Sequence, residues 1–450
     1  MAAQPEKVAA GSTAAAVTPE QNQSADDKKQ MTKTIVAASS GNLVEWFDFY
    51  TYAFFSVYFA EKFFAGTGQT GALMSTAAIF FVGFLMRPLG GYIFGRIADR
   101  QGRKKSMLIA ILMMCAGSLA LAALPTAATV GALAPILLLI VRCLQGLSVG
   151  GEYGSVATYM SEIAPPGKRG FYSSFQYVTL IGGQLLASLV ALIMSTALSE
   201  EQISGGWWRL PFVLGAVAAL ISLWLRNSLE ETVDESDTSK ENSGKLRELL
   251  SYPRPVLVVL GITAVGSLTF YTFTTYMQKF LINTNEISKA ETTRIMTVCL
   301  FLFMLMQPAV GWLSDKIGRK NTMLVYVIAM VILPIPFFKI MTGQRNLWIA
   351  GGLVFFMLIF VSFYTSVSGI LKAEMFPTHV RGLGVGFTYA VGNSLFGGSA
   401  EYAALGLKNI NLAWVFPIYV SVIALLGLIA VIAMKDDRIH STIDGKQSHQ

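Results

Sequence analysis

Charged residues are scarce in this chain of 450 residues. Asp, Glu, Lys and Arg make up 14% of it, whereas hydrophobic residues make up 53% and the mean hydropathy is +0.54. A soluble domain carries about 25% charged residues, so there is too little charge here to cover a water-soluble particle. The composition excludes the two or three soluble domains that the length alone would allow and predicts a membrane protein.

Cysteine and histidine are also rare, at three residues each. Cys115, Cys143 and Cys299 all lie in apolar runs, so we expect small hydrophobic residues and no disulfide framework. We expect no metal site and no cofactor, because no His/Cys cluster is present. A P-loop of the G-x-x-x-x-G-K-[ST] type is absent as well, which argues against ATP-driven pumping within this chain.

One pattern, GLSVG at 146–150, fits the nucleophile motif G-x-S-x-G. That motif needs a turn between a strand and a helix and a histidine partner. Here it lies inside a long apolar run, where its glycines are expected to allow close helix packing. With no catalytic cluster elsewhere, we do not expect an enzyme.

Apolar runs long enough to cross about 30 Å of hydrocarbon recur along the chain. There are twelve, at roughly 34–60, 72–95, 106–125, 133–161, 170–197, 210–227, 255–282, 292–313, 321–341, 347–373, 382–407 and 411–434. The sequence therefore predicts an all-α membrane protein with twelve transmembrane helices.

Polar stretches divide these runs into parts. The expected parts are a disordered cytosolic tail at 1–32, a six-helix bundle at 33–228, a cytosolic linker at 229–254, a second six-helix bundle at 255–435 and a cytosolic tail at 436–450. The first tail has no apolar core, so it is neither a signal peptide nor a span.

Lysine and arginine set the expected orientation, since cytoplasmic loops carry an excess of them. One set of loops holds Arg96, Arg100, Arg103, Lys104, Lys105, Lys168, Arg169, Lys316, Arg319, Lys320 and Arg381, and the opposite set holds only Lys62, Arg209, Lys289, Arg294, Arg345 and Lys408. The first set and both termini are expected in the cytoplasm. Because these cations are spread between apolar segments, we expect no nucleic-acid partner despite the basic pI of about 9.1.

The two halves repeat each other. GRIADRQGRKKSM at 95–107 matches GWLSDKIGRKNTM at 311–323, and YMSEIAPPGKRG at 159–170 matches LKAEMFPTHVRG at 371–382. The offsets, 216 and 212, are nearly equal. A repeat of six spans predicts two pseudo-symmetric bundles, a plan known in secondary transporters.

The first repeated loop has the pattern G-x-x-x-D-R-x-G-R-K. Its carboxylate can face the positive N-terminus of a neighbouring helix, and its arginine can pair with that carboxylate. We expect a conformational latch between the halves, formed by Gly95, Asp99, Gly102, Arg103, Asp315 and Arg319. The alternative is a basic loop that only sets topology.

These loops, together with GNLVEWFDFYTYAFFSVYFA, RCLQGLSVGGEYGSVATYMSE and GILKAEMFPTHVRGLGVG, resemble the metabolite:proton symporter family of the major facilitator superfamily. FYTFTTYMQKFLINT and FGGSAEYAALGLK are most similar to family members that carry alpha-ketoglutarate. The resemblance covers about residues 33 to 435. It implies proton-coupled uptake of a dicarboxylate such as alpha-ketoglutarate across a bacterial inner membrane, by a functional monomer with both termini in the cytoplasm.

Charges inside the spans are the first candidates for the site, because a charge at the bilayer centre costs at least about 2.5–3.5 kcal/mol. Glu45 and Asp48 lie on one helix face and are candidates for proton coupling, with a structural ion pair as the alternative. Arg87 could bind an anionic substrate or pair with one of these acids. Arg142 and Gln145 are candidate substrate ligands.

Glu152 shares a helix face with Arg142. It could accept a proton or neutralise Arg142 when the site is empty. Uncharged polar groups and one lysine of other spans could complete the substrate site or could only join helices: Gln176, Gln184, Tyr276, Tyr364, Lys372 and Asn393. Lys372 lies near an expected helix end and could instead snorkel to the interface.

The function expected from these features is symport of a small anionic metabolite and protons through the lipid bilayer by alternating access. Three alternatives stay open. The same fold could carry another organic acid (citrate, shikimate or an aromatic acid) or a betaine. It could also work without protons. A receptor that senses a metabolite without moving it is a remote possibility, since no signalling domain follows the last span.

Overall fold

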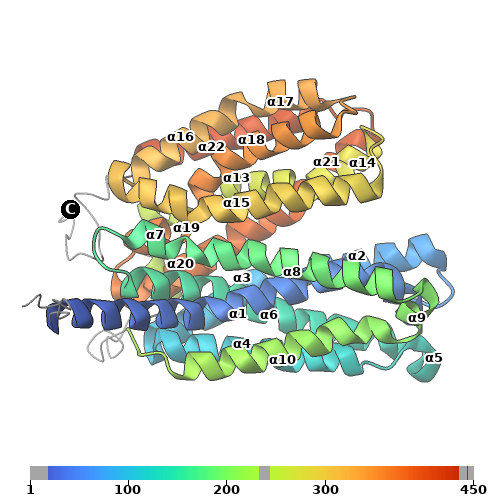
Figure 1. Ribbon diagram of the computed structural model, residues 1–450, viewed down its shortest axis with the longest axis horizontal. Coiled ribbons are helices and arrows are strands. Elements are labelled where there is room, and N and C mark those ends of the chain that lie inside the picture. Colours follow the sequence, from blue (N-terminus) through green and yellow to red (C-terminus); the bar gives the residue numbers. More distant parts are fainter. Residues whose placement is uncertain (1–18, 233–243, 435–442, 444–450) are drawn as a thin grey trace, which may run out of the picture.

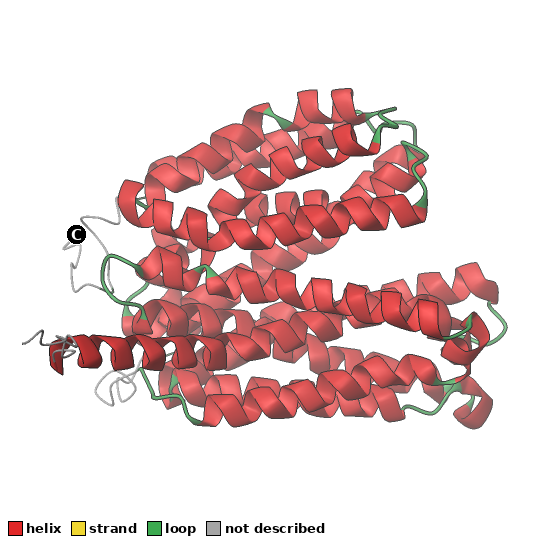
Figure 2. Cartoon of the chain, viewed as in Figure 1, coloured by secondary structure: helices red, strands yellow, loops and turns green. Residues whose placement is uncertain are grey.

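A computed structural model describes residues 19–232, 244–434 and 443 of the chain. Within these ranges every regular element is a helix (Figure 2). The N-terminal half contains α1 (Pro19–Phe63), α2 (Gly68–Leu85), α3 (Arg87–Gln101), α4 (Arg103–Ala123), α5 (Ala127–Val130), α6 (Leu133–Ile163), α7 (Arg169–Ser173), α8 (Phe175–Ala197), α9 (Glu200–Gly205), the 3-10 turn η1 (Trp207–Arg209) and α10 (Leu210–Asn227).

The C-terminal half follows a short helix of the linker, α12 (Leu246–Leu250). It contains α13 (Pro253–Tyr271), the π-helical turn η2 (Thr272–Tyr276), α14 (Met277–Asn283), α15 (Lys289–Ile317), α16 (Arg319–Ile332), α17 (Pro334–Met341), α18 (Leu347–Thr365), α19 (Ser368–Glu374), α20 (Thr378–Gly392), the π-helical turn η3 (Asn393–Gly397), α21 (Gly398–Asn409) and α22 (Val415–Ala433).

Each of the twelve predicted runs coincides with one helical rod. Six rods are interrupted: α2–α3, α7–α8, α13–η2–α14, α16–α17, α18–α19 and α20–η3–α21. A bend of 49° separates α16 from α17, where Pro334 begins the second helix. In the described ranges nine helices are long and apolar enough to cross a membrane, or ten if the bent pair is one span.

The internal repeat is visible in the backbone at two glycines. Gly102 separates α3 from α4 with φ 99°, and Gly318 separates α15 from α16 with φ 89°. Backbone in this region strains residues that carry a Cβ. Both copies of the repeated loop therefore end one helix and start the next in the same way.

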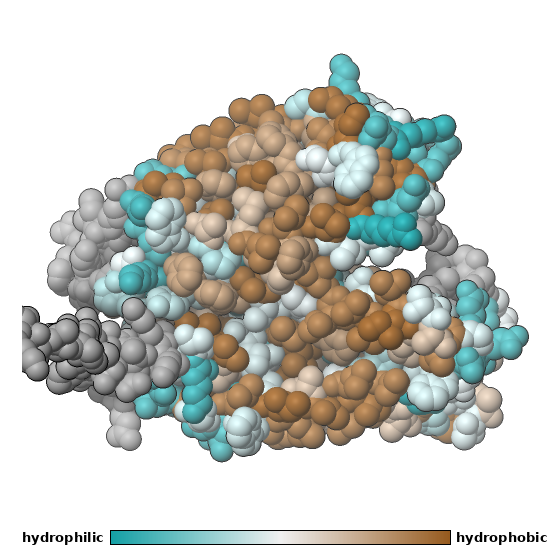
Figure 3. All heavy atoms as spheres, viewed as in Figure 1, coloured by the Kyte–Doolittle hydropathy of each residue, from teal (hydrophilic) through white to brown (hydrophobic). Residues whose placement is uncertain are grey.

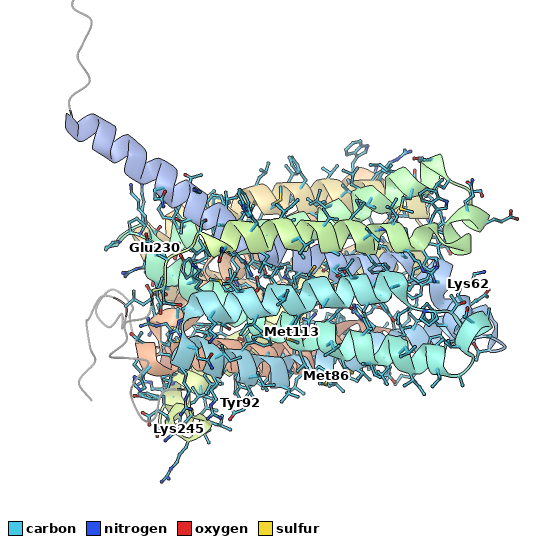
Figure 4. The ribbon with its side chains drawn as sticks, turned by 90° about the horizontal axis from the view of Figure 1, so that it is seen from below. Lys62, Met86, Tyr92, Met113, Glu230 and Lys245 are labelled. Atoms are coloured by element: carbon cyan, nitrogen blue, oxygen red, sulfur yellow. The ribbon has the colours of Figure 1, made fainter. Side chains whose placement is uncertain are left out.

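The two halves lie side by side along their length (Figure 1). Hydrophobic side chains cover the middle of the molecule and polar ones gather at its two ends (Figure 3), which is the surface that a bilayer requires. We call the end where α3 meets α4 and α15 meets α16 the latch end. Figure 4 shows Glu230 and Lys245 at this end and Lys62 at the opposite one, so the linker and the C-terminal end of α1 lie at opposite ends of the molecule.

The tails and the linker differ in part from expectation. Helix α1 begins at Pro19, inside the stretch expected to be disordered. Proline suits the first position of a helix, and the Glu, Gln and Lys that follow are good helix formers. The linker forms α12, with Leu249 buried. Residues 1–18, 233–243 and most of the final tail lie outside the described ranges.

Candidate substrate and proton site

The predicted latch joins the two halves at their latch end. The Asp99 carboxylate of α3 accepts hydrogen bonds from the backbone N–H groups of Gly382 and Leu383 in α20, both at 2.8 Å. Arg103 donates to Asp99 at 2.5 Å and to the Thr378 carbonyl at 3.0 Å. Asp99 and Arg103 are fully buried, so this connection is shielded from water and crosses the domain boundary.

The second copy of the motif makes the reciprocal connection. Asp315 of α15 accepts from the N–H groups of Gly170 and Phe171 in α7, at 2.7 and 2.9 Å. Arg319 donates to Asp315 at 2.9 Å. Each half therefore presents a carboxylate to the backbone near the start of a helix in the other half, where the helix dipole favours negative charge.

An additional residue strengthens the first latch. Glu162 lies 2.7 Å from Arg381 of the other half and 3.4 Å from Arg103. Glycines let the halves meet here: a Cβ at Gly95 would stand 2.7 Å from the Leu383 Cα atom, closer than such atoms approach. Gly95 thus serves the close contact between α3 and α20.

Glu152 has a partner that the sequence analysis missed. Arg226 of α10 donates to both carboxylate oxygens of Glu152, one of them at 3.0 Å, and also to the carbonyls of Ala38 and Met107. Both charged side chains are buried. This bidentate pair joins α6 to α10 beside α1, so Glu152 neutralises Arg226 and not Arg142.

Removing one member of this pair is expected to destabilise the protein strongly. In Arg226→Leu the Glu152 carboxylate stays buried without its partner, which costs about 3–5 kcal/mol. Replacing both, as Glu152→Leu with Arg226→Leu, should restore most of the loss because no unpaired charge remains. Thermal unfolding in detergent measures this, and equal losses in the single and double variants would contradict it.

Asp48 ends a chain of hydrogen bonds inside the N-terminal half. Its two carboxylate oxygens accept from Ser118 and from the Gln145 side-chain nitrogen, both at 2.6 Å. The Gln145 oxygen accepts in turn from Arg142 at 2.9 Å. The Arg142 guanidinium also stacks 4.0 Å from the centre of the Tyr52 ring. Arg142, Gln145 and Asp48 thus act as one connected unit.

Two small cavities lie beside this chain, and Arg87 lines both. The first, of about 10 Å³, is bounded by Asp48, Arg142 and Gln145, and the second, of the same size, by Glu45, Tyr153 and Tyr389. Each is about large enough for one water molecule. Asp48 and Glu45 thus each line a small cavity together with Arg87.

Arg87 sits in an aromatic cage. Its guanidinium carbon lies 3.8 Å from the centre of the Phe84 ring, 4.9 Å from that of Phe49 and 5.6 Å from that of Trp46. Rings around a desolvated cation contribute about 2 kcal/mol. The cage holds Arg87 in place where it lines the cavity with Tyr153 and Tyr389.

Lys372 supplies a second buried cation from the other half. Its Nζ atom donates to Ser368 at 2.6 Å, to Tyr153 at 2.9 Å and to Tyr364 at 3.3 Å. All three acceptors are neutral hydroxyl groups. A fully buried ammonium that is balanced only by neutral groups is an attractive site for an anion.

A pair of tyrosines connects the two cations. Tyr153 of α6 and Tyr389 of α20 stack with ring centres 3.4 Å apart and planes at 11°. Lys372 lies over both rings, 4.5 Å from the centre of Tyr389 and 4.9 Å from that of Tyr153. Arg87 shares a cavity with the same pair, so both cations lie at a common aromatic wall, the Tyr153–Tyr389 pair, between the halves.

Comparison of the chain with known families decides the class of protein. A family model, Major Facilitator Superfamily, matches residues 38–401. The chain belongs to the major facilitator superfamily. Members of this superfamily are transporters and not enzymes.

Relatives of the chain are similar over most of its length. It is 52% identical over 413 residues to the alpha-ketoglutarate permease of Escherichia coli (strain K12), covering 92% of this chain and 96% of the relative. It is 32% identical over 423 residues to a proline/betaine transporter of Salmonella typhimurium (strain LT2), covering 91% and 84%. A structure of the proton:xylose symporter XylE with 6-bromo-6-deoxy-D-glucose matches with a TM-score of 0.75 at 16% identity, over 92% of this chain and 98% of that one, which shows the fold.

Several buried polar atoms have no hydrogen-bond partner among the described residues. They are the hydroxyls of Tyr50 and Tyr271, the side-chain nitrogen of Asn393 and the side-chain oxygen of Gln184. Buried polar groups of a folded protein are normally satisfied. In a superfamily transporter such atoms are expected to meet the solute or water that it carries.

The remaining predicted ligands divide into two groups. Tyr364 belongs to the Lys372 cluster, and Gln176 lies nearby, donating to the Tyr153 carbonyl at 3.2 Å. Tyr276 is separate: its ring packs against Phe280 and Phe416. Among the described residues no three His, Cys, Asp or Glu side chains gather closely enough to hold a metal ion.

Proposed function

We propose that this protein is a proton-coupled symporter that imports a dicarboxylate such as alpha-ketoglutarate across a bacterial inner membrane by alternating access. The observation that carries the substrate class is the pair of buried cations, Arg87 and Lys372, one in each half, on a shared aromatic wall. The alpha-ketoglutarate permease of Escherichia coli, at 52% identity, supports the same substrate.

Two cations suit a solute with two carboxylates. One carboxylate binds the Arg87 guanidinium and the other the Lys372 ammonium, since charge-assisted hydrogen bonds are about twice as strong as neutral ones. The unpaired atoms of Tyr50, Tyr271 and Asn393 bind the remaining oxygens of the substrate. Because Arg87 and Lys372 belong to different halves, the bound dianion draws the halves together.

We assign proton coupling to Asp48 or Glu45. Both are buried and line a cavity with Arg87. Ser118 and Gln145 are neutral donors to Asp48, so gain of a proton removes a charge that no ion pair balances. A neutral acid lowers the cost of closing the cavity around a bound substrate.

The structure corresponds to a state that is closed at the latch end. Both latches are engaged, and the space-filling view shows a notch between the halves at the opposite end (Figure 3). With the latch end and both termini in the cytoplasm, this state is closed toward the cytoplasm, and Arg87 and Lys372 are buried in it. The protein works as a monomer, because the two halves of one chain contain every group named above.

Uptake into liposomes tests the function. The purified protein is expected to accumulate labelled alpha-ketoglutarate when the outside is made acidic, and a protonophore is expected to abolish the accumulation. Competition with citrate, shikimate, an aromatic acid, proline and betaine separates the rival substrates, since betaine and proline carry one carboxylate and use one anchor. Uptake that does not depend on the pH gradient would refute proton symport. Stronger competition by another solute would refute alpha-ketoglutarate as the substrate.

The latch is expected to control access from the cytoplasm. In Asp99→Asn the side-chain nitrogen cannot accept a hydrogen bond, so the backbone N–H of Gly382 or Leu383 loses its acceptor. Arg103 also loses its ion pair with Asp99, so the latch-closed state weakens. A cysteine introduced at Phe387, whose ring contacts Tyr92 across the boundary, should then be labelled at least tenfold faster from the latch end, a shift of about 1.4 kcal/mol. If the Phe387 cysteine is labelled at the same rate with Asp99 intact and in Asp99→Asn, Asp99 acts only as a topology signal.

A further inference from the structure

A groove on the membrane-facing surface of the N-terminal half has no part in the proposed transport path. It encloses about 660 Å³, and α1, α7, α8 and α10 line it. On the face shown in Figure 1, α1 forms its floor between α8 and α10. Val36 and Ile221 on its walls are 53% and 55% exposed, so the groove opens toward lipid.

The dimensions of the groove match one leaflet of a bilayer. Its lining on α1 runs from Thr32 to Val44, which is about 18 Å at 1.5 Å per residue. One leaflet of a bilayer core is about 15 Å thick, half of about 30 Å. The groove begins at the latch end of α1 and α7 and therefore follows the direction of a lipid chain in that leaflet.

The chemistry of the lining favours a hydrocarbon chain over a polar ligand. Most lining residues are hydrophobic. The hydroxyl groups in the wall bond within the protein: Ser40 to Ser222 at 2.7 Å, and Thr179 to the Phe175 carbonyl at 3.1 Å. The polar groups of the lining are thus satisfied, and the surface they leave is apolar.

Two exposed lysines are close in sequence to residues that line the latch end of the groove. Lys33 follows Thr32 on α1, and Lys168 lies three residues before Phe171, which is part of the lining. Lysines at this depth attract anionic headgroups, at about 1 kcal/mol for each residue. We propose that the groove binds one acyl chain of an anionic phospholipid whose headgroup lies between Lys33 and Lys168.

The position of Phe171 links this lipid to the latch. Its side chain lines the groove, and its backbone N–H donates to Asp315 at 2.9 Å. A chain packed against Phe171 and Tyr172 supports α7 in the conformation that Asp315 holds. The bound lipid therefore stabilises the latch-closed state, and this second step rests on the proposed alternating access.

Lipid retention tests the site. The full-length protein is purified in detergent with equal phosphatidylglycerol and phosphatidylcholine, and native mass spectrometry counts the lipids that stay bound. Ala218→Trp and, from the opposite wall, Val36→Trp fill the groove and should each lower phosphatidylglycerol retention roughly tenfold. Leu220→Trp, on the same helix but outside the lining and 50% exposed, is the matched control and should retain the lipid.

A separate variant tests the position of the lipid headgroup. Lys33→Gln with Lys168→Gln should remove the preference for phosphatidylglycerol over phosphatidylcholine while the acyl chain still binds. Equal retention in Ala218→Trp, Val36→Trp and Leu220→Trp would overturn the site, and an unchanged preference in the lysine variant would overturn the headgroup assignment. Neither result depends on transport, so failure of this proposal is distinct from failure of symport.

The link to the latch is measured by labelling of the Phe387→Cys reporter in phosphatidylcholine vesicles with and without phosphatidylglycerol. Phosphatidylglycerol should slow labelling from the latch end in the wild-type background and leave Ala218→Trp unaffected. Labelling that is independent of phosphatidylglycerol in both backgrounds would show that the lipid does not support α7.

Discussion

Lys372→Gln is expected to abolish dicarboxylate uptake. The ammonium is buried among the neutral oxygens of Ser368, Tyr153 and Tyr364, and in the proposed complex a substrate carboxylate completes its coordination. Loss of one partner of a buried charge pair costs about 2–5 kcal/mol, or roughly 30- to 5,000-fold in affinity. Binding of labelled alpha-ketoglutarate to purified protein measures the effect apart from transport.

The substrate's second carboxylate gives this prediction a sharper form. If Arg87 and Lys372 each hold one carboxylate, Lys372→Gln should weaken binding of a dicarboxylate far more than that of a monocarboxylate of equal length. Arg87→Gln should show the same selectivity, because either variant leaves one anchor. A merely structural lysine would weaken both ligands alike.

Lys279→Gln is the matched control. Lys279 also belongs to the C-terminal half, but it is half-exposed and forms its ion pair with Glu401. This variant should bind alpha-ketoglutarate normally. Full binding by Lys372→Gln, with the protein folded, would remove Lys372 from the site and with it the argument for a dianion.

The sequence predicts the fold well because the fold is governed by local properties. Each span is a continuous apolar run, so its length and place follow from hydropathy alone. The latch was predictable for another reason: the repeated loop placed Asp99 and Asp315 in equivalent positions, and the structure puts both carboxylates on backbone N–H groups of the other half. Its role in gating remains a prediction.

The site was harder to predict because it depends on tertiary contacts and helix breaks. Arg226 lies at the end of the sixth apolar run, where an arginine usually meets water, and nothing local pairs it with Glu152, 74 residues away. Lys372 lies near the end of α19, yet it is fully buried. No sequence pattern marked Tyr50 as a site residue, because a tyrosine in an apolar run resembles any other aromatic residue there.

Arg142, a candidate substrate ligand from the sequence, illustrates the same limit. The sequence places it inside an apolar run, but tertiary hydrogen bonds decide what it contacts. The guanidinium binds Gln145 and stacks on Tyr52, and Gln145 in turn binds Asp48. The structure therefore places Arg142 nearer to the candidate proton site than to Lys372, and a direct contact with substrate stays a prediction.

Asp48→Asn is expected to keep the exchange of alpha-ketoglutarate and to lose its accumulation. Asparagine can accept from Gln145 through its oxygen and donate to Ser118 through its nitrogen, so it reproduces the hydrogen bonds of a protonated aspartate. The variant should exchange internal for external alpha-ketoglutarate at a rate near that of the wild type. It should not concentrate the substrate when the outside is acidic, because the site can no longer gain or lose a proton.

The three candidate carboxylates give different results in this experiment. Wild-type uptake should rise as the external pH falls, since the outward-facing site must be protonated before it closes. If Asp48 carries the proton, this dependence is lost in Asp48→Asn and kept in Glu45→Gln; the reverse result assigns the proton to Glu45. If both variants keep the pH dependence of uptake, the assignments of the proton to Asp48 and to Glu45 are both contradicted.

Glu152→Gln should behave differently from both, because Glu152 already has a cation. Without its negative charge the Arg226 guanidinium stays buried with only neutral acceptors, at a cost of about 3–5 kcal/mol. The expected defect is a lower unfolding temperature and less protein in the membrane, with coupling intact in the molecules that fold. A carboxylate bound to a permanent cation is thus a brace for α6 and α10, whereas one held only by neutral donors is free to exchange its proton.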